Sequence, residues 1–226
     1  MIVIARSNMP RHPRPQRVPR AAVARPVREG GSQGNAHGVD YFIGDHLVAR
    51  VYFHPGSAID WETHYDDEGR LHGVERQELE DGSPRYRARW VHGRQHGLQR
   101  QWNERGRLLV RTRFVNGTGT DLWFDCGRLA DERQFVRGER HGVERWWRDR
   151  KTVWHELNFF RGVRHGPERE WNEHGRLRRG FPRYFVKGSR VSRTAYDRAR
   201  VVDSALPAIR GADDKPTRRR LRWKRR

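Results

Sequence analysis

Hydrophobic and polar positions alternate over short stretches in the middle of the chain, between residues 69 and 196. Aromatic and aliphatic side chains recur in segments of about seven to nine residues, and Arg or Glu occupy alternate positions. Glycines separate these segments, and glycine supplies the positive φ that chain reversals need. Because glycine recurs too often for unbroken helices, the pattern predicts antiparallel β-hairpins.

The hairpin pattern is repeated. Glycines at positions 69, 93, 117, 138, 162 and 188 align with spacings of 21–26 residues. An aromatic residue precedes five of these glycines by three positions, and a His-Gly pair follows four of them. The third unit lacks three residues and its His-Gly pair. A lone hairpin is marginally stable, whereas stacked hairpins pair their backbones and align their aromatic side chains. We therefore expect an all-β fold, an antiparallel β-hairpin repeat solenoid of about five to six repeats.

The repeat pattern Gly-x-x-His-Gly, Trp, turn, Gly-Arg-Leu and Phe-Val-x-Gly resembles the MORN-repeat variant of bacterial YwqK-type antitoxins. The resemblance covers residues 69 to about 196 and, more loosely, the segment from Tyr41. It implies an elongated antiparallel sheet that binds and has no catalytic residues of its own. For bacterial members it implies an antitoxin or immunity protein that masks a cognate toxin, and for other MORN proteins a membrane or protein scaffold.

The ends of the chain differ from the repeats in composition. We expect residues 1–39 to be a disordered basic tail and 198–226 a basic C-terminal tail, flanking repeats at 69–197. Residues 40–68 carry two apolar runs and are either a β cap or a degenerate first repeat. The formal net charge is +20, of which residues 1–34 contribute +6 and residues 198–226 contribute +8. The tails could therefore contact nucleic acid or an anionic lipid surface, or could simply be solvated.

The sequence offers no convincing catalytic, cofactor or metal site. The histidines of the His-Gly pairs would lie two strands apart, roughly 9–10 Å, which is too far for one zinc ion to bind neighbouring members. We expect them instead to hydrogen-bond the neighbouring backbone. The single Cys126 lies in a turn and excludes internal disulfides. We therefore predict a protein that is not an enzyme, and a cytoplasmic one, because no stretch approaches the ~20 apolar residues of a membrane span.

Aromatic and arginine side chains are the candidate binding residues. A tryptophan column could be the core of an aliphatic-poor protein or could be exposed for recognition, beside an Arg/Glu face that we expect on the opposite side of the sheet. The candidates are Trp102, Trp123, Trp147, Trp171, Arg100, Arg145 and Arg169. The leading hypothesis is a monomeric scaffold that binds another protein, which could be a toxin. The alternative is a binder of nucleic acid or anionic membrane surfaces through the tails and the aromatic/Arg face.

Overall fold

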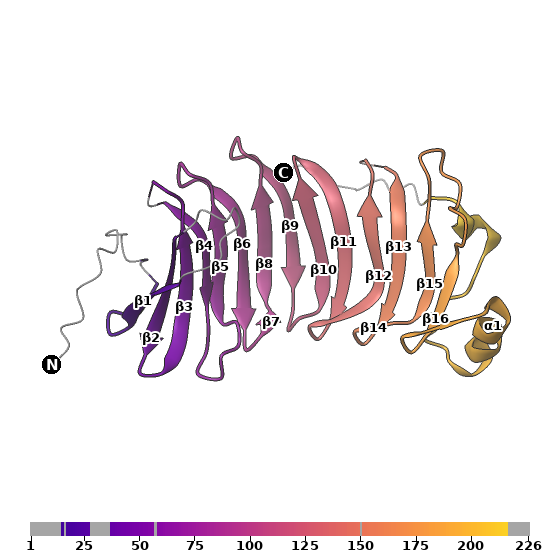
Figure 1. The fold of residues 1–226 in the computed structure, drawn as a ribbon, viewed down its shortest axis with the longest axis horizontal. Coiled ribbons are helices and arrows are strands. Elements are labelled where there is room, and N and C mark those ends of the chain that lie inside the picture. Colours follow the sequence, from indigo (N-terminus) through magenta and orange to yellow (C-terminus); the bar gives the residue numbers. More distant parts are fainter. Residues whose placement is uncertain (1–14, 16, 28–36, 57, 150, 217–226) are drawn as a thin grey trace. The chain divides into compact units, whose positions relative to one another are not determined.

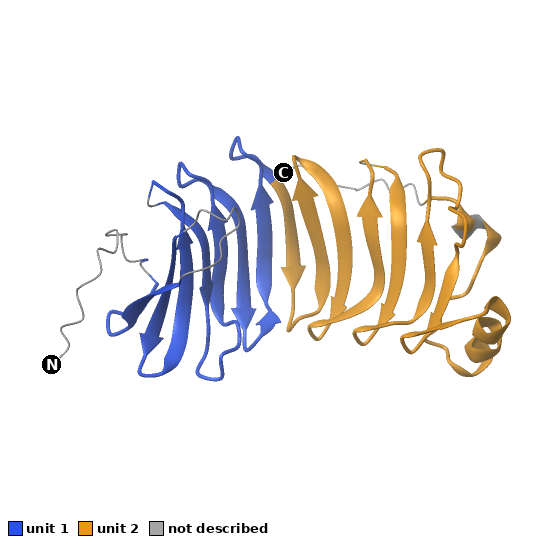
Figure 2. Cartoon of the chain, viewed as in Figure 1, with its two compact units in different colours: residues 1–108 blue, residues 109–226 orange. Residues whose placement is uncertain are grey.

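The computed structural model describes the chain except for residues 1–14, 16, 28–36, 57, 150 and 217–226. The described chain is nearly all β, with antiparallel sheets, one α-helix and one 3-10 turn (Figure 1). This confirms the all-β, antiparallel part of the predicted fold class. Two compact units, Met1–Leu108 and Leu109–Arg226, divide the chain (Figure 2).

The first unit contains one antiparallel sheet whose strands follow the order of the chain. Its strands are β1 (Val23–Val27), β2 (His37–Ile43), β3 (His46–Phe53), β4 (Ile59–His64), β5 (Gly73–Glu78), β6 (Pro84–Val91), β7 (Arg94–Gln95) and β8 (Gly97–Trp102). They pair in the order β1-β2-β3-β4-β5-β6-β8, with β7 on β6. Residues 40–68 thus contribute strands to this sheet.

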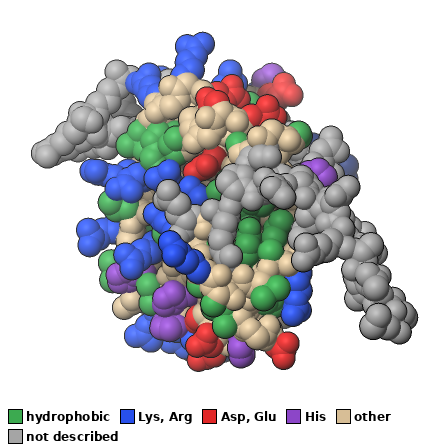
Figure 3. All heavy atoms as spheres, turned by 90° about the vertical axis from the view of Figure 1, so that its left-hand side faces the viewer, with side chains coloured by type: hydrophobic (Ala, Val, Ile, Leu, Met, Phe, Trp, Pro, Cys, Tyr) green, Lys and Arg blue, Asp and Glu red, His purple; other side chains and the backbone are tan. Residues whose placement is uncertain are grey.

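The prediction of a disordered tail over residues 1–39 is wrong for its later part. Residues Val23–Val27 form β1, which pairs with β2, and Val18 and Ala22 are buried in one core cluster with Val51 and Phe53. The apolar side chains within the Pro/Arg-rich stretch explain the difference, because they cover the hydrophobic core at this end of the sheet. Seen from the β1 end, hydrophobic side chains still reach the surface between basic ones (Figure 3).

The second unit contains an antiparallel sheet followed by a helix. Strand β9 (Leu108–Phe114) comes first in this part of the chain and does not belong to this sheet. The strands of the sheet are β10 (Gly119–Asp125), β11 (Arg128–Val136), β12 (Glu139–Trp147), β13 (Val153–Phe160), β14 (Val163–Arg164), β15 (Gly166–Glu170), β16 (Arg183–Val186) and β17 (Ser189–Val191). They pair in the order β10-β11-β12-β13-β15-β16-β17, with β14 on β13. Helix α1 (Arg193–Val202) begins at Ser192, whose hydroxyl accepts a hydrogen bond from the Ala195 N–H, and a 3-10 turn follows at Gly211–Asp214.

Two kinds of turn join the strands. In the first kind, two residues with positive φ reverse the chain, and the second is glycine: His92-Gly93, Asn116-Gly117, Cys126-Gly127, Arg137-Gly138, Arg161-Gly162 and Lys187-Gly188. In the second kind, an Asp or Asn side chain accepts two backbone N–H groups, as Asn103 and Asn172 do. Gly69 follows Asp66 in a turn of the second kind, whereas Gly93 and Gly162, with which it is aligned, lie in turns of the first kind. The alignment itself holds, because the histidine three residues after each glycine makes the same backbone hydrogen bond.

The His-Gly pairs lie where the strand pairing is irregular. Trp90 pairs with Gln95 before His96-Gly97 and Tyr86 pairs with Gln101 after it, so the register shifts by two residues. The Nδ1 of His165 accepts the backbone N–H of Lys187 at 3.1 Å. The Nδ1 of His72 likewise accepts the N–H of His92 at 3.4 Å. These two contacts confirm the expected bond from histidine to the neighbouring backbone.

Candidate binding face

One face of the second sheet is covered by the C-terminal segment, and we call it the packed face. Tyr196 of α1 is fully buried against Tyr184, and its hydroxyl donates to the Pro207 carbonyl at 2.8 Å. Further along, Trp171 Nε1 donates to the carbonyl of Asp214 at 2.8 Å. The prediction of a plain basic tail from residue 198 onward is therefore wrong up to residue 216, because Leu206 and its neighbours complete a core cluster.

The packed face also holds two of the four tryptophans of the predicted column. Trp147 and Trp171 are 5% and 1% exposed and pack with Leu129 and Val153. Their rings form core in this sheet, as the first of the two readings expected. A buried tryptophan stabilises through its large apolar area and offers no surface to a partner.

Two of the three predicted arginines, Arg145 and Arg169, lie on the same packed face. Leu122, Glu132, Arg145, Glu156 and Arg169 form one row across the sheet. Arg145 bonds Glu156 at 2.8 Å and lies 3.8 Å from Glu132, and Arg169 bonds Glu156 at 3.1 Å. Arg145 is two residues from Trp147 on β12, so both point to one face. The expectation that the Arg/Glu face lies opposite the tryptophan column is therefore wrong here.

Trp123 lies on the other face, which we call the open face. Leu122 stands in the same cross-strand row as Arg145, and Trp123 does not. Phe124 follows Leu122 by two residues, as Trp147 follows Arg145, so Phe124 takes the position on the packed face that corresponds to Trp147. The third sequence repeat, which contains Trp123, is three residues shorter than its neighbours. It lacks the His-Gly pair and the two-residue register shift that goes with it, and its next turn, Cys126-Gly127, is one residue shorter. Loss of two residues leaves the alternation of side chains unchanged, but loss of the third turns Trp123 to the opposite face of the sheet.

The open face brings Trp123 into a row with residues that the sequence analysis did not single out. Trp123, Asp131, Trp146 and His155 pair directly across β10, β11, β12 and β13. The rings of Trp146 and His155 stack with centroids 4.9 Å apart. Trp123, Trp146 and His155 are all partly exposed. The signal for Trp146 was the doublet Trp146-Trp147, because adjacent strand residues must point to opposite faces.

Arginines form the outer layer of the open face and lie over buried carboxylates. Glu144 is bonded by Arg140 at 3.0 Å and approached by Arg133 at 3.3 Å, while its own side chain is 3% exposed. The side chains of Arg133 and Arg140 are 32% and 45% exposed. Each guanidinium carries more N–H donors than one carboxylate uses, so the face presents oriented donors to a ligand.

Asp131 is the exceptional acid of this row. Burial raises the pKa of its carboxyl to about 6; the nearby Asp121 and Glu144 act in the same direction, and Arg133 opposes them. Its Oδ2 lies 3.1 Å from Arg133, and its Oδ1 has no hydrogen-bond partner among the described residues. A buried carboxyl oxygen without a hydrogen bond thus lies between two tryptophans in this row.

The remaining candidates, Arg100 and Trp102, lie on β8 of the first unit. Arg100 pairs with Arg87 across the sheet, and both Arg100 and Trp102 are partly exposed. They belong to a different sheet from Trp123.

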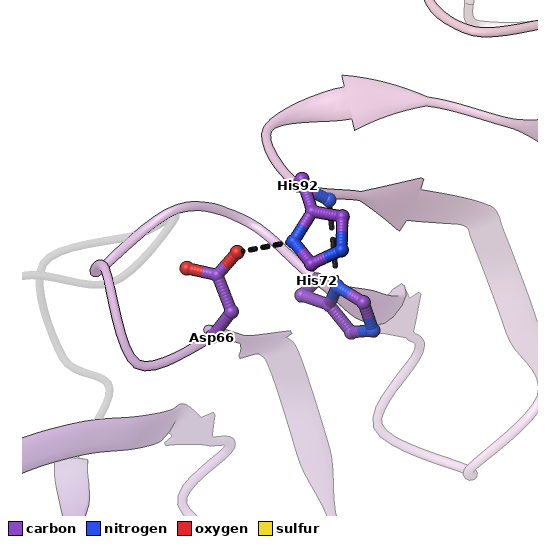
Figure 4. Close-up of side chains that lie close together, drawn as sticks. All are labelled: Asp66, His72 and His92. Carbon is purple, nitrogen blue, oxygen red and sulfur yellow. Dashed lines mark hydrogen bonds and ion pairs between the residues drawn. The ribbon is translucent and has the colours of Figure 1, made fainter.

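A separate cluster in the first unit brings Asp66, His72 and His92 together (Figure 4). One ligand atom from each lies within 4.8 Å of the others, which is a spacing that a metal ion could draw together. Arg70 occupies the cluster, however: it bonds Asp66 Oδ2 at 2.9 Å and lies 3.0 Å from His92 Nδ1. Desolvation acts to raise the pKa of Asp66, but hydrogen bonds from His92 and Arg70 outweigh it and hold the pKa well below its usual range. The guanidinium charge satisfies Asp66, so the cluster serves as a brace between two turns.

Comparison with known proteins gives no relative for this chain: no family model matches it, and no curated protein matches it in sequence. In the part of the chain that the structure describes, no helix has the length and apolar character that crossing a bilayer requires.

Proposed function

We propose that the protein is a non-enzymatic scaffold of MORN-like β-hairpin repeats that binds another protein through the open face of its second sheet. Within that function we propose an antitoxin or immunity role, in which the open face masks a cognate toxin. The observation that carries the proposal is the row of Trp123, Asp131, Trp146 and His155, which lies on the face that the C-terminal segment leaves open.

The chemistry of this face suits a protein partner. Tryptophan and arginine are enriched at the energetic centres of protein interfaces, where their large surfaces are desolvated on binding. Here both are fixed before binding: Trp146 by its stack on His155, and Arg133 and Arg140 by Glu144. Side chains that are already ordered lose less entropy when a partner binds.

The contacts of the titratable side chains support a non-enzymatic role. His155 is the histidine of the open face, and its contacts among the described residues are Glu168 at 3.1 Å and three aromatic rings. An activated nucleophile would need a hydroxyl or thiol within hydrogen-bond reach of such a base. Cys126 is exposed in its turn, and its Sγ lies 3.6 Å from Asp125 Oδ1.

The test uses the purified product of the gene adjacent to the one that encodes this protein. We expect calorimetry to detect a complex and co-expression to relieve any growth arrest that this product causes. Trp123→Ala and Trp146→Ala should weaken the complex at least tenfold, as truncations at interface centres do. Arg179→Ala, an exposed residue outside the row, is the matched control. Equal affinity of all variants would refute the role of the open face, and absence of any complex would refute the antitoxin proposal.

A further inference from the structure

The two-residue turns at one end of the second sheet carry a regular set of cations. Three consecutive turns of this end have the pattern cation-Gly-x-Arg: Arg137-Gly138-Glu139-Arg140, Arg161-Gly162-Val163-Arg164 and Lys187-Gly188-Ser189-Arg190. All six cationic residues are exposed. We call Arg137, Arg140, Arg161, Arg164, Lys187 and Arg190 the basic turn edge. The turns His92-Gly93-Arg94-Gln95 and Asn116-Gly117-Thr118-Gly119 lack the pattern.

Hydrogen bonds hold these turns in line. The N–H of Gly162 donates to the Arg140 carbonyl at 2.9 Å, and the N–H of Gly188 donates to the Arg164 carbonyl at 2.8 Å. Each turn is therefore tied to the hairpin before it. Because successive turns are two strands apart, the cations recur at roughly 9–10 Å along the edge, and three turns span roughly 19 Å.

The positive charge of this edge is only partly compensated. Arg140 and Arg164 contact Glu144 and Glu168, whose side chains are nearly buried. At the first turn position, Arg137, Arg161 and Lys187 have no carboxylate partner among the described residues. Glu139 is the exposed acid within these three turns. Even when Glu139, Glu144 and Glu168 are all counted, the six cations outnumber the carboxylates two to one.

Aromatic rings orient several of the guanidinium groups. The guanidinium carbon of Arg140 lies 5.3 Å from the ring centre of Phe159, and that of Arg164 lies 5.2 Å from that of Phe185. Arg161 lies 5.4 Å from the ring centre of Phe160. A cation over a ring keeps its outward N–H donors available to an acceptor.

We propose that the basic turn edge binds the phosphate backbone of a nucleic acid strand. A strand carries about one phosphate per 3.4 Å, so a length of roughly 19 Å offers five to six phosphates, which matches six cations in a row. The exposed apolar residues here, Val136 and Val163, are small and lack the aromatic anchors that membrane-surface segments use. A linear polyanion therefore fits this edge better than a bilayer does. This inference goes beyond the proposed function, because it concerns a different partner and a surface centred on the turns rather than on the tryptophan row, although Arg140 belongs to both.

The test replaces the three first-position cations in the full-length protein. Asn-Gly is the preferred dipeptide of this turn type, so the triple variant R137N/R161N/K187N keeps the turns while removing three charges. The matched control, R128N/R176N/R179N, removes three exposed cations elsewhere in the same unit. Thermal unfolding of both variants checks that the fold is retained.

Binding is measured by fluorescence anisotropy with a labelled single-stranded DNA oligonucleotide at several salt concentrations. Losing three phosphate contacts should reduce the slope of log K against log salt by about 2, which corresponds to about fifty-fold weaker binding at 150 mM salt. The control should lose much less. The proposal is overturned if R137N/R161N/K187N binds DNA with the affinity and salt slope of the wild type. It is also overturned if the control variant loses as much DNA affinity as the triple variant does.

Vesicles of phosphatidylcholine and phosphatidylserine provide the second arm. If the triple substitution abolishes vesicle binding and leaves DNA binding intact, the edge is a lipid contact and the nucleic-acid proposal is wrong. Trp123→Ala should leave DNA binding unchanged, because its ring is on the open face. A result that refutes nucleic-acid binding at the basic turn edge can therefore be told apart from a result that refutes protein binding at the open face.

Discussion

Replacing Asp131 by Asn should stabilise the second unit at neutral pH and remove a pH dependence. The pKa of Asp131 rises from its ordinary 3.8 to about 6, with burial as the largest cause. Because one pKa unit corresponds to about 1.4 kcal/mol, ionising this carboxyl in the folded protein costs about 3 kcal/mol relative to the unfolded chain. Asn is nearly isosteric, and its carbonyl can keep the contact with Arg133 while its amide can donate to the neighbouring carboxylates.

The sign follows from linkage between folding and proton binding. Below pH 3.8 both states of Asp131 are protonated and the folded state carries no penalty. Between pH 3.8 and 6 the unfolded chain loses the proton first, so stability falls as pH rises. Above pH 6 the carboxyl is ionised in both states, so the free energy of unfolding falls no further through Asp131. The variant lacks this proton, so its advantage over the wild type should grow across the same interval.

Urea unfolding from pH 3 to pH 8 measures the effect, with the wild type and Asp131→Asn compared at each pH. Asp125→Asn, which changes an exposed turn residue, is the control and should show no such growth. An advantage of Asp131→Asn that stays constant over the whole range would refute the reasoning, because it would mean that Asp131 ionises as freely in the fold as in water.

The sequence predicts the strands and turns because their causes are local. Glycine at Gly138 and Gly162 marks turns that need positive φ, and alternating side chains mark the strands between them. The core role of Trp147 and Trp171 is also foreseeable, because a chain poor in aliphatic residues must bury its aromatic rings.

The candidate site could be predicted only in part, because its face depends on register. Trp123 looks like a member of the tryptophan column when motifs are aligned, but the missing bulge and the shorter turn move it to the other face. Asp131 carries no signal in sequence, since its raised pKa arises from burial among β10, β11 and β12. The contacts of the C-terminal segment are likewise long-range, so its composition alone reads as a tail.

Three further predictions test the fold around the candidate face. Asp66→Asn should destabilise the first unit at pH 7 and less so in acid, because a lowered carboxyl pKa gives stability that is present above about pH 4 and lost as pH falls further; urea unfolding at pH 2–7 checks this. Trp171→Ala should cost about 3–5 kcal/mol, whereas Trp123→Ala should barely change the melting temperature. Equal losses in these two variants would assign Trp123 to the core. Deleting residues 198–226 should lower the melting temperature of the second unit far more than deleting 217–226, because the longer deletion removes Leu206 from its cluster and the Asp214 carbonyl from Trp171. Calorimetric scans of the two truncated proteins decide this: equal melting temperatures would mean that the segment over the packed face contributes nothing to stability, and the distinction between packed and open faces would fail with it.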